Sequence, residues 1–507
     1  MSPHGAVSHR RVARHTLWNI FGYIAPLVVA FFALPPTVAR LGIERYGLLA
    51  LILVVHDYFN YFDFGLGRAT TRFMASAVHD PARKDSAGAV LWTCLLFHVG
   101  LGILVGLLFY LGLPLVTERL LVGSPALVIE GRATLRVAAL LAPVLLFMIA
   151  VRGALEAAQR FDLVNAVKVP SNTLTFLLPL VGAAAGLALP AIIGLFVVAR
   201  LAAGLVYLAL CLREFPSART PRLDLSLTRP LFSFGGLVMA TNLAGLLLID
   251  GERFLISALA SVEALTYYSV PNDASTRLWI IPASVASALF PIFTIAASGA
   301  DTRSGRLYAD STLYLVILFV PLVVVLEAFA GPLMGLWMGA AFAERATLVL
   351  QISTIGVFLD SLARIPLTYL QATGRPGIPA RIRIYQLPVY LLMSAFCITR
   401  WGITGAAWVW SGRIALETAV LFAVTSRGGY VTLPADALAR LNRGLLVSVL
   451  VLLCGAAVTW MVPAGVLVRM ALTGLLLLVY AWYAWLALVD PGHREKIGLL
   501  MARATPS

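Results

Sequence analysis

The chain is built from long apolar runs that alternate with short polar segments. A helix that crosses the hydrocarbon core of a bilayer needs about 20 mostly apolar residues. Runs of that kind are found at roughly 16–39, 46–78, 88–113, 132–156, 163–185, 187–212, 231–257, 265–296, 311–338, 347–371, 384–400, 404–425, 444–463 and 466–490. The pattern therefore predicts an all-α polytopic membrane protein with about 14 transmembrane helices.

The polar segments between these runs are too short to form a soluble domain. The longest, Arg213 to Pro230, has 18 residues. Hydrophobic residues make up 60% of the 507 positions and charged residues 12%, whereas soluble proteins have about 45–50% and 25%. With a mean hydropathy of +0.91, the chain has too few polar side chains to cover a soluble globule. Its activity is therefore expected inside the membrane.

The positive charge of the chain mainly indicates orientation. Lys and Arg total 38 and Asp and Glu 24, which gives a net charge of +14. With the N-terminus in the cytoplasm, 29 of the 38 basic residues fall on the cytoplasmic side and 9 on the outer side. Cytoplasmic loops carry the excess of Lys and Arg, so both termini are predicted to be cytoplasmic and no nucleic-acid partner is expected. The basic start runs into the first span without a small-residue cleavage site, so we interpret it as a retained span.

The two halves of the chain repeat one another. The sequence RATTR ends at Arg72 and DASTR at Arg277, while Arg152 and Arg200 match Arg364 and Arg413 at offsets of 212 and 213 residues. Six spans per half give parallel repeats, with substrate expected at their interface. The predicted division is a cytoplasmic N-terminus 1–15, a six-helix bundle 16–212, a cytoplasmic central loop 213–230, a second six-helix bundle 231–425, a cytoplasmic loop 426–443, transmembrane helices 13 and 14 in 444–490, and a cytoplasmic tail 491–507.

Two of the predicted spans carry a polar stripe. If span 46–78 is one helix, at 100° per residue five polar or small residues fall within about 80° of one another: Asp57, Tyr61, Gly65, Arg68 and Arg72. In span 347–371, a similar stripe contains Asp360, Arg364, Thr368 and Gln371. A charge at the centre of a bilayer costs about 2.5–3.5 kcal/mol on insertion scales, so each stripe needs a physical reason.

Further charges within the spans come in closely spaced pairs: Asp250 with Arg253, Asp273 with Arg277, and Arg413 with Glu417. Such pairs can neutralise each other on one helix face and reach the interface along their alkyl stems. Arg277 and Arg413 lie near the middle of their spans, where a water-filled cationic cavity is the better explanation. The acids are either counter-ions or ion-coupling sites, and the candidates are Asp57, Asp250, Asp273, Asp360 and Glu417.

The chain lacks the sequence signatures of the common catalytic and metal sites. It contains no G-x-x-x-x-G-K-[ST] loop, no G-x-S-x-G and no H-E-x-x-H, so neither ATP hydrolysis nor hydrolase chemistry is indicated. Its four cysteines lie in apolar runs without a C-x-x-C spacing, which is typical of small buried side chains. We therefore expect no metal, no cofactor and no enzymatic activity.

Three segments resemble bacterial polysaccharide transporters, the repeat-unit or O-antigen type flippases. They are NIFGYIAP…GLGRATTRFMA at 19–75, LLIDGERF…ASALFPIFT at 247–294 and YLQATGRPGIPARIR…WVWSGR at 369–413. The resemblance implies the multidrug/oligosaccharidyl-lipid/polysaccharide exporter fold, with two six-helix bundles in a V, alternating access and two extra C-terminal helices. It implies an undecaprenyl-pyrophosphate-linked oligosaccharide, a polysaccharide or lipopolysaccharide repeat unit, as substrate in the bacterial inner membrane. Implied pathway partners are a polysaccharide polymerase and glycosyltransferases.

The residues of the first span bear on the choice of substrate. Lipid II flippases of this superfamily carry arginines there, and drug exporters usually carry a carboxylate, whereas this span offers Asn19, Gly22, Tyr23 and Pro26. A cation-coupled multidrug or small-molecule exporter remains an alternative. A membrane-embedded polysaccharide ligase or polymerase is a second alternative, although it would need a large outer loop. Arginine binds pyrophosphate bidentately, and the candidate substrate-binding residues are Arg68, Arg277, Arg364, Arg413, Asn19 and Tyr61.

Overall fold

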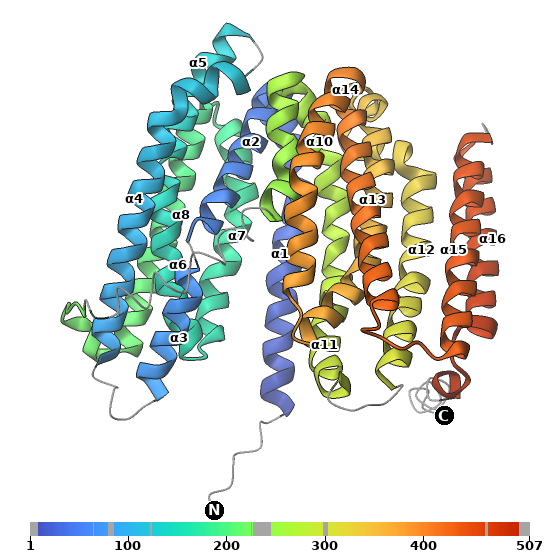
Figure 1. The fold of residues 1–507 in the computed structure, drawn as a ribbon. Coiled ribbons are helices and arrows are strands. Elements are labelled where there is room, and N and C mark those ends of the chain that lie inside the picture. Colours follow the sequence, from blue (N-terminus) through green and yellow to red (C-terminus); the bar gives the residue numbers. More distant parts are fainter. Residues whose placement is uncertain are drawn as a thin grey trace, which may run out of the picture. The chain divides into compact units, whose positions relative to one another are not determined.

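The computed structural model describes residues 9–63, 65–79, 86–121, 124–224, 226, 245–297, 303–461 and 465–495, and the side chains of 9–24 lie outside the described residues. Every regular element in these ranges is a helix (Figure 1). The predicted all-α class is confirmed. Within the described ranges, nine helices are long and apolar enough to cross a membrane, or ten if α2 (Ile43–Tyr61) and α3 (Leu66–His79) form one bent span. The protein is a multi-pass membrane protein.

The first compact unit comprises Met1–Thr266. Besides α2 and α3, it contains α1 (His9–Leu41), α4 (Ala87–Leu120), α5 (Pro125–Ala138), α6 (Leu141–Ala157), α7 (Phe161–Ala184), α8 (Leu189–Glu214), the short 3-10 helix η2 (Pro216–Arg219) and a helix over 245–259. Helix α6 contacts α2, α3, α4, α7 and α8. Met74, Leu91, Ala154 and Cys211 are buried in the core that these helices share. The centre of this unit is therefore α6.

Small residues let α4 and α6 approach closely. A Cβ on Gly102 would lie 2.5 Å from Cα of Pro143, and one on Gly106 would lie 2.7 Å from the backbone oxygen of Ala139. Because hydrophobic burial does not drive helices together in lipid, close backbone packing of small residues four apart supplies the attraction instead. The apolar run at 88–113 thus has one face adapted to packing against α6.

The predicted span 46–78 is broken, and the reason lies in Asp63. Its carboxylate accepts hydrogen bonds from the backbone N–H of Gly65 at 3.0 Å and of Gly67 at 3.1 Å, as a helix N-cap does. Gly65 has a φ of 72°, which glycine adopts without steric cost. Two helices bent by 42° result. The continuous-helix angles assumed for the first polar stripe are therefore wrong across this break.

The second compact unit comprises Tyr267–Ser507. Its described elements are α10 (Val262–Thr276), which begins in the first unit, η4 (Arg277–Trp279), α11 (Ile280–Ala297), α12 (Arg303–Met338), α13 (Ala340–Ala372), α14 (Gly377–Arg427), α15 (Ala435–Met461), α16 (Val466–Tyr483) and the π-helical turn η5 (Ala484–Leu488). Helix α13 packs against α11, α12 and α14, and α15 packs against α12 and α16. Phe319, Val349 and Trp410 are buried in this unit. The α15–α16 pair therefore attaches to the rest of the unit mainly through α12.

The predicted spans 384–400 and 404–425 are two helices within the segment labelled α14, and they are joined by a sharp turn at Gly402. This residue has φ 58° and ψ −140°, a conformation that other residues rarely adopt. A Cβ on Gly405 would lie 2.3 Å from the backbone oxygen of Cys397, whereas eight residues of straight helix would separate these positions by about 12 Å. The chain therefore folds back on itself, and the two predicted spans lie side by side.

The first part of the predicted central loop 213–230 packs against α4. Trp92 Nε1 donates to the backbone oxygen of Ala218 at 2.8 Å, and the backbone N–H of Asp224 donates to Thr93 Oγ1 at 2.8 Å. Arg219 keeps an exposed side chain within this segment. The loop up to Asp224 is thus anchored to the first unit rather than detached from it.

Candidate functional site

A polar cavity of about 210 Å³ lies inside the first unit, between α2, α6, α7 and α8. Three basic side chains line it, Arg152 from α6, Lys168 from α7 and Arg200 from α8. Asp57 is the carboxylate on its wall. The cavity therefore contains more basic than acidic side chains, which favours an anionic ligand.

Arg200 is the most deeply buried of these cations, with 6% of its surface exposed. Its Nη1 donates to Ser171 Oγ at 2.7 Å and its Nη2 to Thr175 Oγ1 at 2.8 Å. The two hydroxyls lie four residues apart, on one face of α7. The guanidinium also stands 4.9 Å from the ring centre of Phe196. These partners hold the guanidinium in place without neutralising it.

The acids near this cavity are engaged by immediate neighbours. Asp57 Oδ1 lies 2.9 Å from His56 Nδ1, and 62% of the Asp57 side chain is exposed. Glu156 pairs with Arg152, with 3.3 Å between Oε1 and Nε. Neither contact reaches Arg200. Asp57 is therefore placed as a rim residue of the cavity.

In the second unit, Arg413 belongs to a group of three charges, of which two are buried and the third, Arg383, is 37% exposed. Its Nη1 lies 2.9 Å from Glu417 Oε2, one helical turn further on. The other oxygen of Glu417 accepts a hydrogen bond from Arg383 Nε at 2.8 Å. The side chains of Arg413 and Glu417 are only 10% and 7% exposed, and the three groups together carry one positive charge. Glu417 is thus positioned as a counter-ion to two arginines.

Arg364 carries an acidic partner on its own helix and an aromatic one from η4. Its Nη2 lies 2.9 Å from Asp360 Oδ2, and its guanidinium stands 5.6 Å from the ring centre of Trp279. Trp279 in turn stacks on Trp410 of α14, with ring centres 6.2 Å apart. Arg277 begins the same 3-10 turn and is exposed. η4 therefore carries both Arg277 and Trp279 between α10 and α11, and it places Trp279 beside Arg364.

The remaining candidates with described side chains are not among the residues that line the first unit's cavity. Arg68 and Tyr61 have exposed side chains on either side of the α2–α3 break. Asp250 pairs with Arg253 at 3.1 Å, and both side chains are largely buried. Asp273 is half-buried in α10, and Asn19 falls in α1 with its side chain outside the described residues.

Several contributors to these sites were missed from the sequence. In the sequence, Arg200 indicates only the predicted repeat, and Arg383 falls among the 29 basic residues assigned to the cytoplasmic side. Ser171, Thr175 and Trp279 carried no sequence signal, because polar or aromatic side chains are common in transmembrane helices. The first unit's site could have been predicted from two hydroxyl residues four positions apart, Ser171 and Thr175, together with a neighbouring span that contains one arginine, Arg200.

Comparison with known proteins agrees with this architecture. A protein named "Putative O-antigen transporter" from Shigella flexneri is 24% identical over 425 residues, covering 81% of this chain and 96% of that protein. The lipid II flippase MurJ, in an inward closed conformation, superposes with a TM-score of 0.69 at 13% identity, over 93% of this chain and 99% of that one. An inward-facing multidrug resistance MATE family transporter of the MOP superfamily gives 0.64 at 14% identity, over 84% and 95%.

The two solved structures share the fold of this chain, and at such low identity they establish no more than the fold. The family comparison is more specific. Residues 12–297, more than half of the chain, match the family described as polysaccharide biosynthesis protein. This protein therefore belongs to the polysaccharide biosynthesis protein family.

Proposed function

We propose that this protein is a flippase that moves an undecaprenyl-pyrophosphate-linked oligosaccharide, a polysaccharide or lipopolysaccharide repeat unit, from the cytoplasmic to the outer leaflet by alternating access. The observation that carries the proposal is the cavity of the first unit, where Arg200 is buried and held by neutral hydroxyls. A buried charge without an acidic partner is costly. A pyrophosphate would supply the missing negative charge.

The chemistry of the substrate fits these residues. A pyrophosphate joined to sugars is anionic and large, so it cannot cross hydrocarbon unaided. The planar guanidinium of arginine presents paired N–H donors that match phosphate oxygens. We assign substrate contact to Arg152 and Arg200 in the first unit, in addition to the residues expected from the sequence, Arg68, Arg277, Arg364, Arg413, Asn19 and Tyr61. Asp57, Asp250, Asp273, Asp360 and Glu417 serve as counter-ions or ion-coupling groups.

Aromatic side chains suit the sugar part of such a substrate. Trp279 is half-buried, and its indole nitrogen has no hydrogen-bond partner in the described part of the chain. A buried N–H without an acceptor is costly, and sugar hydroxyls are good acceptors. We therefore assign the neighbourhood of η4 to contact with the glycan.

A cation-coupled multidrug exporter is the alternative with structural support, since a MATE family transporter shares the fold. The charge of the first unit's cavity argues against a cationic drug, because Arg152, Lys168 and Arg200 would repel it. A membrane-embedded ligase or polymerase is the second alternative, and the short polar loops of the sequence disfavour it.

The proposal is tested by reconstituting the purified protein in vesicles with a labelled lipid-linked oligosaccharide in both leaflets. An enzyme or probe that attacks only the outward-facing glycan reports its movement over time. We expect wild-type protein to make the inner pool accessible, and a cationic drug to remain untransported in matched vesicles. Transport of the drug but not of the oligosaccharide would favour the exporter.

A further inference from the structure

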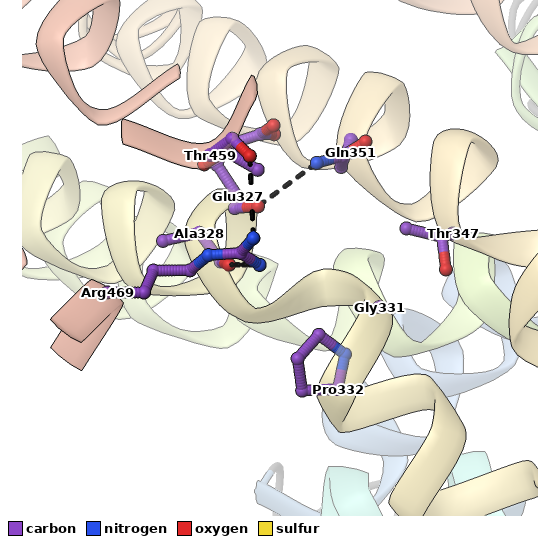
Figure 2. A pocket seen from close by; sticks show the side chains of 8 residues that line it. All are labelled: Glu327, Ala328, Gly331, Pro332, Thr347, Gln351, Thr459 and Arg469. Carbon is purple, nitrogen blue, oxygen red and sulfur yellow. Dashed lines mark hydrogen bonds between the residues drawn. The ribbon is translucent and has the colours of Figure 1, made fainter. Parts of the chain in front are cut away.

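The second unit holds a cavity of about 220 Å³ between α12, α13, α15 and α16 that none of the candidate site residues lines. Figure 2 shows Glu327 and Pro332 of α12, Gln351 of α13, and Thr459 and Arg469 from the α15–α16 pair around it. The cavity therefore lies between the helix bundle, represented by α12 and α13, and the helices α15 and α16, which fall outside the predicted repeat.

Glu327 is the acid deepest in the apolar part of α12. It lies within LVVVLEAFAG, eleven residues before the end of the helix at Met338, which corresponds to about 16 Å along the axis. The hydrocarbon core is about 30 Å thick, so Glu327 lies within the apolar part of the helix, in a cavity that is also lined by Thr459 and Arg469 near the adjoining ends of α15 and α16. A carboxylate at that depth is costly and needs a partner or a function.

Arg469 lines the same cavity but is engaged elsewhere. Pro332 has no N–H, so the carbonyl of Ala328, four residues earlier, lacks its usual helical donor. Arg469 Nη1 donates to this carbonyl at 3.3 Å, and Nη2 donates to the backbone oxygen of Thr459 at 3.5 Å. Gln351 Nε2 donates to the backbone oxygen of Glu327 at 3.0 Å (Figure 2). These donors of the cavity are thus directed to backbone oxygens rather than to the Glu327 carboxylate, and Arg469 Nε is buried without a partner among the described residues.

One carboxylate oxygen of Glu327, Oε1, is buried and has no hydrogen-bond partner within the described ranges. A carboxylate in this position must bind a proton or another cation to avoid a large desolvation cost. A metal ion would need several oxygen ligands at once. The hydroxyls of Thr347 and Thr459 donate to their own helices, at 2.6 and 2.9 Å, and keep their lone pairs free, but the positive charge of Arg469 stands in the same cavity and disfavours a metal ion.

We infer that Glu327 is a proton-binding site, through which a proton gradient acts on transport. Arg469 is the other titratable group among the residues that line the cavity, and it keeps its positive charge at all accessible pH. Protonation of Glu327 would therefore change the local charge from zero to +1. Since α12 links the bundle to α15 and α16, this change occurs where the two parts of the unit meet. The coupling role rests on the proposed flippase function, whereas proton binding does not.

Proton binding is tested on the purified full-length protein with dicyclohexylcarbodiimide, which adds to protonated carboxyls in apolar surroundings. Peptide mass spectrometry should find the adduct on Glu327, increasing as the pH is lowered and unchanged by added sodium. Glu327→Gln should lack the adduct. Glu344→Gln, which removes an exposed acid on α13, should retain it at wild-type level. No adduct at any pH in folded protein, or protection by sodium, would overturn the assignment.

Coupling is tested in the vesicle assay with an imposed pH gradient. We expect the gradient to accelerate oligosaccharide movement by the wild type and by Glu344→Gln, and Glu327→Gln to move it at the rate seen without a gradient. Full acceleration in Glu327→Gln, or none in the wild type, would refute the coupling role. If the wild type moves no oligosaccharide at all, the flippase proposal fails, and the labelling experiment still decides whether Glu327 binds a proton.

Discussion

Arg200 and Arg413 occupy corresponding positions in the repeat predicted from the sequence, but different groups surround their charges. Arg413 shares the buried carboxylate of Glu417 with Arg383. Arg200 is held by two hydroxyls of α7 and by the face of an aromatic ring. The direct hydrogen-bond partners of Arg200 are therefore neutral, and its buried charge is available to attract an anion.

Replacing Arg200 by methionine separates a structural role from a binding role. Methionine fills a similar volume without a charge, and it removes the cost of burying a charge whose hydrogen-bond partners are neutral. We expect Arg200→Met to unfold at the wild-type temperature or higher, yet to abolish glycan export in a complementation assay. Arg219→Met, on the exposed part of the central loop, should export normally. Normal export by Arg200→Met would show that the arginine is not needed to bind substrate.

The same distinction between a structural role and a binding role can be tested for Arg277 and Arg413 in the second unit. Arg277→Ala and Arg413→Ala should each abolish export while membrane abundance stays near normal. Lysine at either position should rescue only partly, because it retains the charge but loses the planar pair of donors. A charged hydrogen bond contributes about 1.5–3 kcal/mol, so export by the lysine variants should fall roughly ten- to a hundredfold.

Loss of the Arg413 variant from the membrane would indicate a structural role, and its ion pair with Glu417 is tested by a separate control. Glu417→Gln keeps the size of the side chain and leaves both arginines hydrogen-bonded. We expect it to reduce stability, as removal of one partner from a buried ion pair usually does. If Arg413→Ala and Arg277→Ala both export normally, or fail only through degradation, these arginines are structural.

At the scale of the elements, the α2–α3 break depends on one side chain. Asp63 accepts two backbone hydrogen bonds at the start of α3, and loss of an N-cap costs about 0.5–2 kcal/mol. Asp63→Ala should therefore lower the unfolding temperature of the purified protein, while Asp63→Asn should lower it less. An unchanged unfolding temperature in Asp63→Ala would indicate that other contacts fix the break.

Hydrophobic periodicity predicted the helices well, because apolar length is a direct requirement of the bilayer. It failed where a side chain bonds to the backbone, as at Asp63, since residue counting does not detect a cap inside an apolar run. Pairs on one helix, such as Asp360 with Arg364, could be expected from their spacing of four. Contacts between helices, such as Arg383 with Glu417, depend on how α14 folds back at Gly402, which no local pattern specifies. Glu327 was missed because it has no charged neighbour in sequence.

At the scale of the whole molecule, the prediction concerns orientation in the membrane. With 29 of 38 basic residues on one side, the positive-inside rule places both termini and the central loop in the cytoplasm. A reporter active only in the cytoplasm should work at Ser226, beyond the backbone bond from Asp224 to Thr93, and after Arg503. A reporter active only outside should work at Gly339, where the chain turns between α12 and α13. An outside signal from Ser226 would place an odd number of spans before it and would remove the parallel six-span repeat. It would also put the basic cavity of the first unit in the wrong orientation to load a substrate made in the cytoplasm, so the flippase mechanism would fail with the topology.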